Sequence, residues 1–149
     1  MRTVDGALTR ELRRRVLRAG QPPELPLPGD DQPDARHVAA FDDDGALLGA
    51  CLIFPQPCDW RPETPAWILR SMAVDPDRQR GGVGRAVLDG AERLARDEGA
   101  AVLWCHARET AEGFWHGRGW LDRHPDGQPD QVYVEPATGL PHRDLYRLL

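Results

Sequence analysis

Apolar residues recur along this chain with two different periods. In residues 83–95 they return every three or four positions, as on one face of a helix, and Gly99 supplies the expected C-terminal stop. Residues 6–18 show the same period, with arginines on the opposite face. Residues 67–74, by contrast, form an almost continuous apolar run that predicts a buried strand.

Shorter apolar runs predict the remaining elements of the fold. Two of them, at 37–41 and 46–54, are joined by an Asp-rich segment ending in Gly45, which favours a hairpin. Further strands are predicted at 101–106, 131–135 and 142–148, a short helix at 110–117, and proline-rich loops at 21–33 and 55–65. A hairpin followed by strand, helix and strand predicts the α/β class, with a mixed sheet covered by helices.

A glycine-rich turn stands between the central strand and the central helix. Residues 79–85 read QRGGVGR, and Asp75 and Pro76 end the strand before them. Glycines bring successive backbone N–H groups close to an anion, and the start of a helix adds further donors, so this turn predicts a phosphate site. A Walker loop would need Lys-Ser/Thr after Gly84, and a dinucleotide fingerprint would need a small residue at Val87, so neither motif fits.

Composition limits what else the chain can be. Its 149 residues suit one domain, 1–149, and its net charge of −5 disfavours nucleic acid as a partner. All 19 basic side chains are arginine. No signal peptide or membrane span is evident, so a cytoplasmic protein is expected, with free thiols at its three cysteines. Cys105, His106 and His116 lack convincing ligand spacing, so no metal is expected.

Three segments together resemble one enzyme superfamily. The spacing Gln79-x-x-Gly82-x-Gly84, the run FWHGRGW at 114–120 and the run TGLPH at 138–142 are similar to segments of the GNAT superfamily of acetyl-coenzyme A-dependent N-acetyltransferases. The last run is similar to the Gly-x-Pro-His closing segment of a small branch. The resemblance implies a mostly antiparallel sheet that splays between its fourth and fifth strands, with acetyl-CoA as cosubstrate.

The resemblance also implies which residues hold the coenzyme. Backbone groups of the fourth strand would hold the pantetheine arm, and the glycine-rich turn would hold the pyrophosphate. The coenzyme-binding residues implied in this way are Met72, Ala73, Val74, Gln79, Arg80, Gly81, Gly82, Val83, Gly84, Arg85, Arg108 and Trp115.

The catalytic groups are less clear, because Trp115 stands where the family has a tyrosine as general acid. An indole N–H cannot donate a proton at useful pH. The candidate catalytic residues are His106, at the end of a strand beside the expected gap, and Tyr133 and Glu135, in a segment that lines the acceptor side of similar folds. We hypothesise that His106 or Glu135 accepts the amine proton through water.

The function that follows is transfer of an acetyl group to a primary amine of a small molecule or peptide, by direct attack in a ternary complex. Trp115 motivates an alternative, a catalytically weak or silent acyl-coenzyme A sensor. A component that acts through protein contacts is a third interpretation. The acceptor and the oligomeric state, including a homodimer, stay open.

Overall fold

A computed structural model of the protein describes residues 2–20, 27, 29–79, 81–123, 132–136 and 139–149. No helix in these ranges is both long and apolar enough to cross a membrane. The helical elements are α1 (Ala7–Leu17), η1 (Pro76–Arg78), α2 (Val83–Asp97), η2 (Glu109–Ala111) and α3 (Glu112–Gly117). The strands are β1 (Arg2–Val4), β2 (Arg36–Phe41), β3 (Leu47–Pro55), β4 (Ala66–Val74), β5 (Val102–Arg108), β6 (Leu121–Asp122), β7 (Val132–Val134) and β8 (Pro141–Leu148).

The strands form one mixed sheet, in the order β1-β2-β3-β4-β5-β8-β6, with β7 also paired to β8. All pairs are antiparallel except β4 with β5, which the α2 crossover makes parallel. The predicted mixed sheet with helices on its faces is therefore confirmed. The sequence prediction missed β1 and β6, which are too short to show a period.

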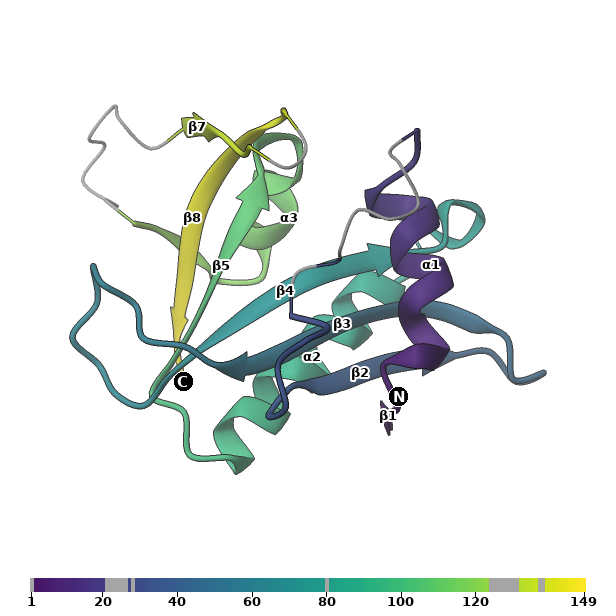
Figure 1. The fold of residues 1–149 in the computed structure, drawn as a ribbon, viewed down its shortest axis with the longest axis horizontal. Coiled ribbons are helices and arrows are strands. Elements are labelled where there is room, and N and C mark those ends of the chain that lie inside the picture. The colour runs from purple at the N-terminus through teal and green to yellow at the C-terminus, as the bar shows by residue number, and fades with distance from the viewer. Residues whose placement is uncertain (1, 21–26, 28, 80, 124–131, 137–138) are drawn as a thin grey trace.

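The parallel pair β4 and β5 separates part of the way along. Pairing runs from Ala66 with Val102 to Leu69 with Cys105 and then stops. Beyond this point β4 stays with β3 and β5 stays with β8, so the two strands diverge (Figure 1). Ser71 has a φ of 55°, and the β3–β4 register shifts beside it, as at a β-bulge. The bulge lies at the start of the gap.

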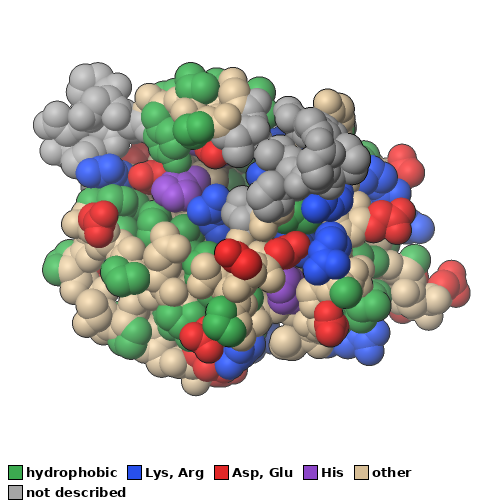
Figure 2. Space-filling model, in the orientation of Figure 1, with side chains coloured by type: hydrophobic (Ala, Val, Ile, Leu, Met, Phe, Trp, Pro, Cys, Tyr) green, Lys and Arg blue, Asp and Glu red, His purple; other side chains and the backbone are tan. Residues whose placement is uncertain are grey.

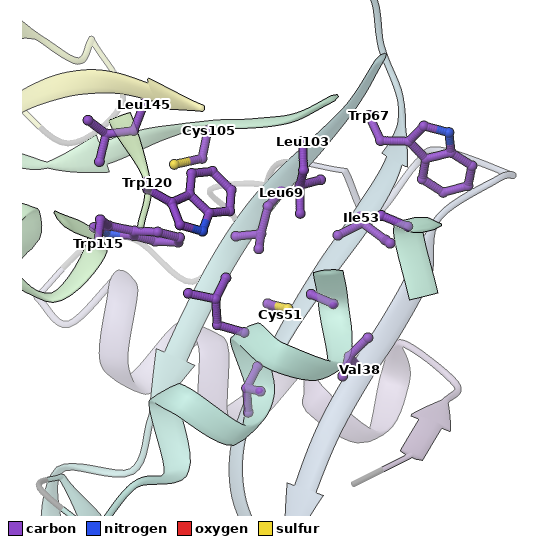
Figure 3. Packing of buried hydrophobic residues seen from close by; sticks show 14 of the residues in the cluster. Val38, Cys51, Ile53, Trp67, Leu69, Leu103, Cys105, Trp115, Trp120 and Leu145 are labelled. Atoms are coloured by element: carbon purple, nitrogen blue, oxygen red, sulfur yellow. The ribbon is translucent and has the colours of Figure 1, made fainter. Parts of the chain in front are cut away.

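The two long helices cover opposite faces of the sheet, with α1 in front of the strands and α2 behind them in Figure 1. Apolar residues of α2, including Val87, Leu88 and Ala91, pack against the sheet in the larger core cluster. Trp115 and Trp120 extend that cluster to β5 and β8, beside Cys105 and Leu145 (Figure 3). The core thus fixes both strands that border the gap.

Candidate active site

A cavity of about 700 Å³ lies where β4 and β5 diverge. Its walls come from the end of α1, from β4 and β5, from the glycine-rich turn, from α3 and from the β7–β8 region. On the α1 face, histidine, acidic and basic side chains lie next to one another over β5 and β8 (Figure 2). The lining includes Leu17, Arg18, Arg70, Met72, Val74, Gln79, Gly82, Gly84, Arg85, Cys105, His106, Arg108, Phe114, Trp115, Glu135 and His142.

Strand alternation decides which side chains share a face. Ile68 and Trp104 pair across β4 and β5, and both belong to the core cluster on the face opposite α2. Two residues further along each strand come Arg70 and His106, which therefore project from that same face. The ring of His106 packs edge-on against Trp104, with 5.1 Å between centroids. Arg70 and His106 are the first such residues past the last paired position, at the mouth of the gap.

The glycine-rich turn leads directly into α2. Gly82 is the N-cap with φ 80° and ψ 5°, a left-handed conformation, and no side chain caps the helix. The first intrahelical bond runs from Ala86 N to Gly82 O, so the amides of residues 83–85 precede it and remain as donors. The first turn carries no acidic residue. This helix start is suited to bind an anion.

His106 is held by two partners on neighbouring strands. Its Nδ1 lies 2.6 Å from Asp144 Oδ1 and 2.7 Å from the Tyr133 hydroxyl, which itself donates to Asp144 Oδ1 at 2.9 Å. A carboxylate only accepts, so Nδ1 donates to Asp144, and in the neutral ring this leaves the lone pair on Nε2. Among the described residues, Nε2 has no hydrogen-bond partner, and His106 lines the cavity. This arrangement can take a proton from a ligand.

Two other groups near His106 do not exchange protons at neutral pH. Burial and the neighbouring carboxylate of Asp144 raise the pKa of Tyr133 far above its ordinary value, so its hydroxyl stays protonated and acts as a donor. Burial raises the pKa of the Cys105 thiol as well, and the charge of Asp144 adds to this. Cys105 therefore lines the cavity as a thiol and not as a nucleophilic thiolate.

Arginines and one glutamate complete the α1 side of the cavity. Burial lowers the pKa of Arg70, while the charge of Glu135 opposes this. Burial also lowers the pKa of Arg108, whose Nη2 donates to the Leu17 carbonyl at 2.9 Å. Glu135 lines the same cavity. The charge of Glu135 also raises the pKa of Arg108, so this carboxylate acts on both arginines.

Trp115 belongs both to the hydrophobic core and to the wall of the cavity. Its side chain is only 5% exposed and packs on Trp120, with 4.8 Å between ring centroids, yet it forms part of the cavity wall. The Trp120 indole donates to Glu92 Oε1 at 2.9 Å, which ties this wall to α2. Trp115 thus supplies an apolar surface where the family pattern has a phenol.

The structure brings most of the predicted site residues to one cavity. Tyr133 does not line the cavity itself but contacts His106, which does. Ala73, Gly81 and Val83 are not part of the lining, and Arg80 lies outside the described residues. The sequence analysis missed Asp144, Arg70 and Arg18. Asp144 stands opposite His106 only because β5 and β8 pair in this register. Arg70 did have a signal, since it is the one charge within an otherwise mostly apolar strand.

The fold and this cavity define an acyltransferase. The model of the acetyltransferase (GNAT) family matches residues 7–120, and the chain belongs to that family. Acetyl-CoA, which the family uses, is the cosubstrate. A search of curated protein sequences found no match.

Solved structures show the same fold at low sequence identity. A proposed N-acetyltransferase from Lactobacillus plantarum has a TM-score of 0.76 and 19% identity, over 96% of this chain and 90% of that one. A GCN5-related N-acetyltransferase from Kribbella flavida has a TM-score of 0.71 and 22% identity, over 99% and 96%. An aminoglycoside 6'-N-acetyltransferase complexed with coenzyme A has a TM-score of 0.68 and 15% identity, over 99% and 97%. The predicted GNAT fold is confirmed.

Proposed function

We propose that this protein transfers the acetyl group of acetyl-CoA to a primary amine of a small molecule or peptide, by direct attack in a ternary complex. The observation that carries this proposal is the hydrogen bond between His106 and Asp144 at the mouth of the gap, which leaves Nε2 available to an amine in the cavity. Tyr133 supports the same ring orientation by bonding to both partners.

The residues around the gap fit the coenzyme. The amides at the start of α2 and the side chain of Arg85 would hold its diphosphate, because donors and positive charge converge there. An ideal Cβ on Gly82 would meet nothing within 4 Å, so the backbone is open to a ligand at this point. Beyond Leu69 no described strand pairs with the inner edge of β4, so Met72, Ala73 and Val74 would bind the pantetheine arm there.

The chemistry then needs a base, an oxyanion donor and a leaving group. In our proposal His106 Nε2 takes a proton from the amine, directly or through water, while Asp144 stabilises the imidazolium that forms. The amine nitrogen attacks the thioester carbonyl, the C–N bond forms, and the C–S bond breaks with its electron pair on sulfur. A backbone N–H of the Ala73–Val74 region would polarise the carbonyl. The thiolate is a good leaving group, so Trp115 need not act as an acid.

Coenzyme binding is the first test. Thermal unfolding is followed with acetyl-CoA, coenzyme A, NADH and ATP, since a ligand at about 100 times its dissociation constant stabilises by about 2.7 kcal/mol. A selective shift with both coenzyme A species is expected. The absence of such a shift would remove the basis of the proposal.

Catalysis is the second test, by thiol release with a panel of amines. The sensor interpretation, motivated by Trp115, predicts coenzyme binding without turnover of any amine. If His106→Ala and Glu135→Gln each kept full transfer from about pH 6 to about pH 9, neither residue would be the base.

A further inference from the structure

Three arginines from three different elements meet on the α1 side of the cavity. Arg18 caps the C-terminus of α1, Arg70 lies in β4, Arg108 lies in β5, and all three line the cavity. Burial lowers the pKa of Arg70 and of Arg108, and the nearby charge of Arg18 lowers each further. The guanidinium group of Arg18 is therefore close enough to act on both of the others.

These cations have little negative charge beside them. Arg13, Arg61 and Arg147 each form an ion pair, but none of Arg18, Arg70 and Arg108 does so with a described residue. Nε of Arg18 is buried and has no hydrogen-bond partner in the described part of the chain. Glu135 is the carboxylate whose charge acts on both Arg70 and Arg108. In the part of the chain that the structure describes, three positive charges thus face the negative charge of Glu135.

This excess of positive charge is unusual for an acidic chain. The protein as a whole carries a net charge of −5, so a positive cluster in this cavity is not a by-product of composition. Partly buried cations that form no ion pair with the described residues are costly, and an anion that enters the cavity offsets that cost. Guanidinium groups also bind carboxylate and phosphate through paired hydrogen bonds.

We propose that Arg18, Arg70 and Arg108 bind an anionic group on the acceptor, so that the acceptor is a small amine that also carries a carboxylate or a phosphate. The inference rests on the proposed function and narrows its substrate class. Parallel strands lie about 4.8 Å apart where they pair, so Arg70 and His106 start from neighbouring positions on one face. An amine at His106 then has its own anionic group beside Arg70.

The coenzyme is the other anionic molecule that this site must bind. Its diphosphate is expected at the start of α2, which packs on the opposite face of the sheet from Arg70 and His106. That helix start has Arg85 close to it. Arg108, which the family resemblance implies for the coenzyme, donates to the Leu17 carbonyl at the end of α1. The geometry therefore assigns the cavity arginines to the acceptor.

The test compares matched acceptors in acetyl transfer. Each amino acid is paired with its amide, and O-phosphoethanolamine with ethanolamine, so that members of a pair differ mainly in the anionic group. We expect at least one anionic member to have a kcat/KM roughly tenfold or more above its neutral partner. Preference for an amino acid identifies a carboxylate, and preference for O-phosphoethanolamine identifies a phosphate. Equal or better use of the neutral partners throughout overturns the proposal but leaves the acetyltransferase function standing.

Variants separate acceptor binding from coenzyme binding. Arg70→Gln and Arg108→Gln should raise KM for the anionic acceptor roughly tenfold or more, with little change in the dissociation constant of coenzyme A. Arg36→Gln, which removes an arginine from the surface of β2, is the matched control and should change neither value. A rise in the coenzyme dissociation constant without a rise in acceptor KM would overturn the assignment.

A binding measurement keeps the inference testable if no amine is acetylated. The coenzyme A-saturated protein is unfolded thermally in sodium acetate or sodium phosphate and in sodium chloride of equal ionic strength. Acetate or phosphate should raise the melting temperature above the chloride value in the wild type and not in the Arg70→Gln/Arg108→Gln double variant. Equal melting temperatures in all three salts would overturn anion binding at this cluster.

Discussion

His106 Nδ1 lies 2.6 Å from Asp144 Oδ1, across the pairing of β5 with β8. The contact orients an imidazole at the point where the sheet opens, and it places a carboxylate where a protonated ring needs one. A second His–Asp pair, His116 with Asp122 at 3.0 Å, lies outside the cavity on a more exposed part of the surface. The two pairs have similar chemistry, so they make a natural comparison.

Asp144→Asn should lower kcat roughly a hundredfold, with coenzyme affinity and acceptor KM little changed. The amide keeps the shape of the side chain but no longer stabilises the imidazolium, and it permits the other ring tautomer. Asp144 would thus act as a positioning residue for His106. Asp122→Asn makes the same change in the surface pair and should leave kcat unaltered. Steady-state kinetics of both variants checks this, and equal effects at the two sites would contradict the assignment.

Cys105 should not carry the acetyl group, although it lines the cavity. Burial holds its pKa well above the ordinary value, so the thiolate needed for attack is scarce at neutral pH. Cys105→Ala should retain kcat within about threefold, the size of a modest packing defect. Double-reciprocal plots of initial rates against both substrates should give intersecting lines, as direct transfer in a ternary complex requires. Cys51→Ala, a buried cysteine outside the cavity lining, is the control. Detection of an acetylated Cys105 by mass spectrometry would disprove direct transfer.

The sequence was sufficient for the elements that carry a strong local pattern. Helix α2 and strand β4 were predicted within a few residues, because their apolar patterns, the glycines that border α2 and the Asp75-Pro76 pair that ends β4 are local features. The opening between β4 and β5 came from the family resemblance alone, and the end of pairing at Leu69 confirms it. No apolar period encodes where two strands stop pairing.

The polar partners of the site could not be predicted in this way. Asp144 follows His106 by 38 residues, and only the register of β5 with β8 brings them together. The arginines of residues 6–18 are predicted only to lie on the polar face of a helix, since their pattern does not show that Arg18 ends the helix beside a cavity. Contacts between distant segments depend on tertiary packing, which sequence spacing does not reveal.

Gly82→Asp should abolish coenzyme binding while the protein stays folded. Nothing lies within 4 Å of an ideal Cβ at this position, so a side chain fits, and Asp tolerates the left-handed conformation better than most residues. At the N-cap its carboxylate would accept from the same amides that the diphosphate needs and would repel that anion.

Gly82→Asn is the matched control for this change, because it has the same shape and backbone preference without the charge. Calorimetric titration with coenzyme A should show that Asp weakens binding at least tenfold more than Asn, a difference of about 1.4 kcal/mol. Equal affinities for the two variants would mean that no anion binds at the start of α2.

His37 should make the folded protein less stable as the solution becomes acidic. Burial lowers its pKa below the ordinary 6.5, and Arg13 lowers it further, while Asp30 and Asp5 oppose these effects in part. Its Nδ1 is buried without a partner among the described residues. Below about pH 6.5 the unfolded chain therefore binds a proton that the folded protein resists, and the free energy of unfolding falls as pH drops toward the lowered pKa.

The variant His37→Gln tests this effect, because glutamine binds no proton in this range. Urea unfolding between about pH 7.5 and about pH 5.5 should show that its free energy of unfolding declines less steeply than that of the wild type. At about pH 8 both proteins are neutral at this position, and the difference there measures lost packing alone. Identical slopes for the two proteins would show that His37 takes up no proton on unfolding in this range.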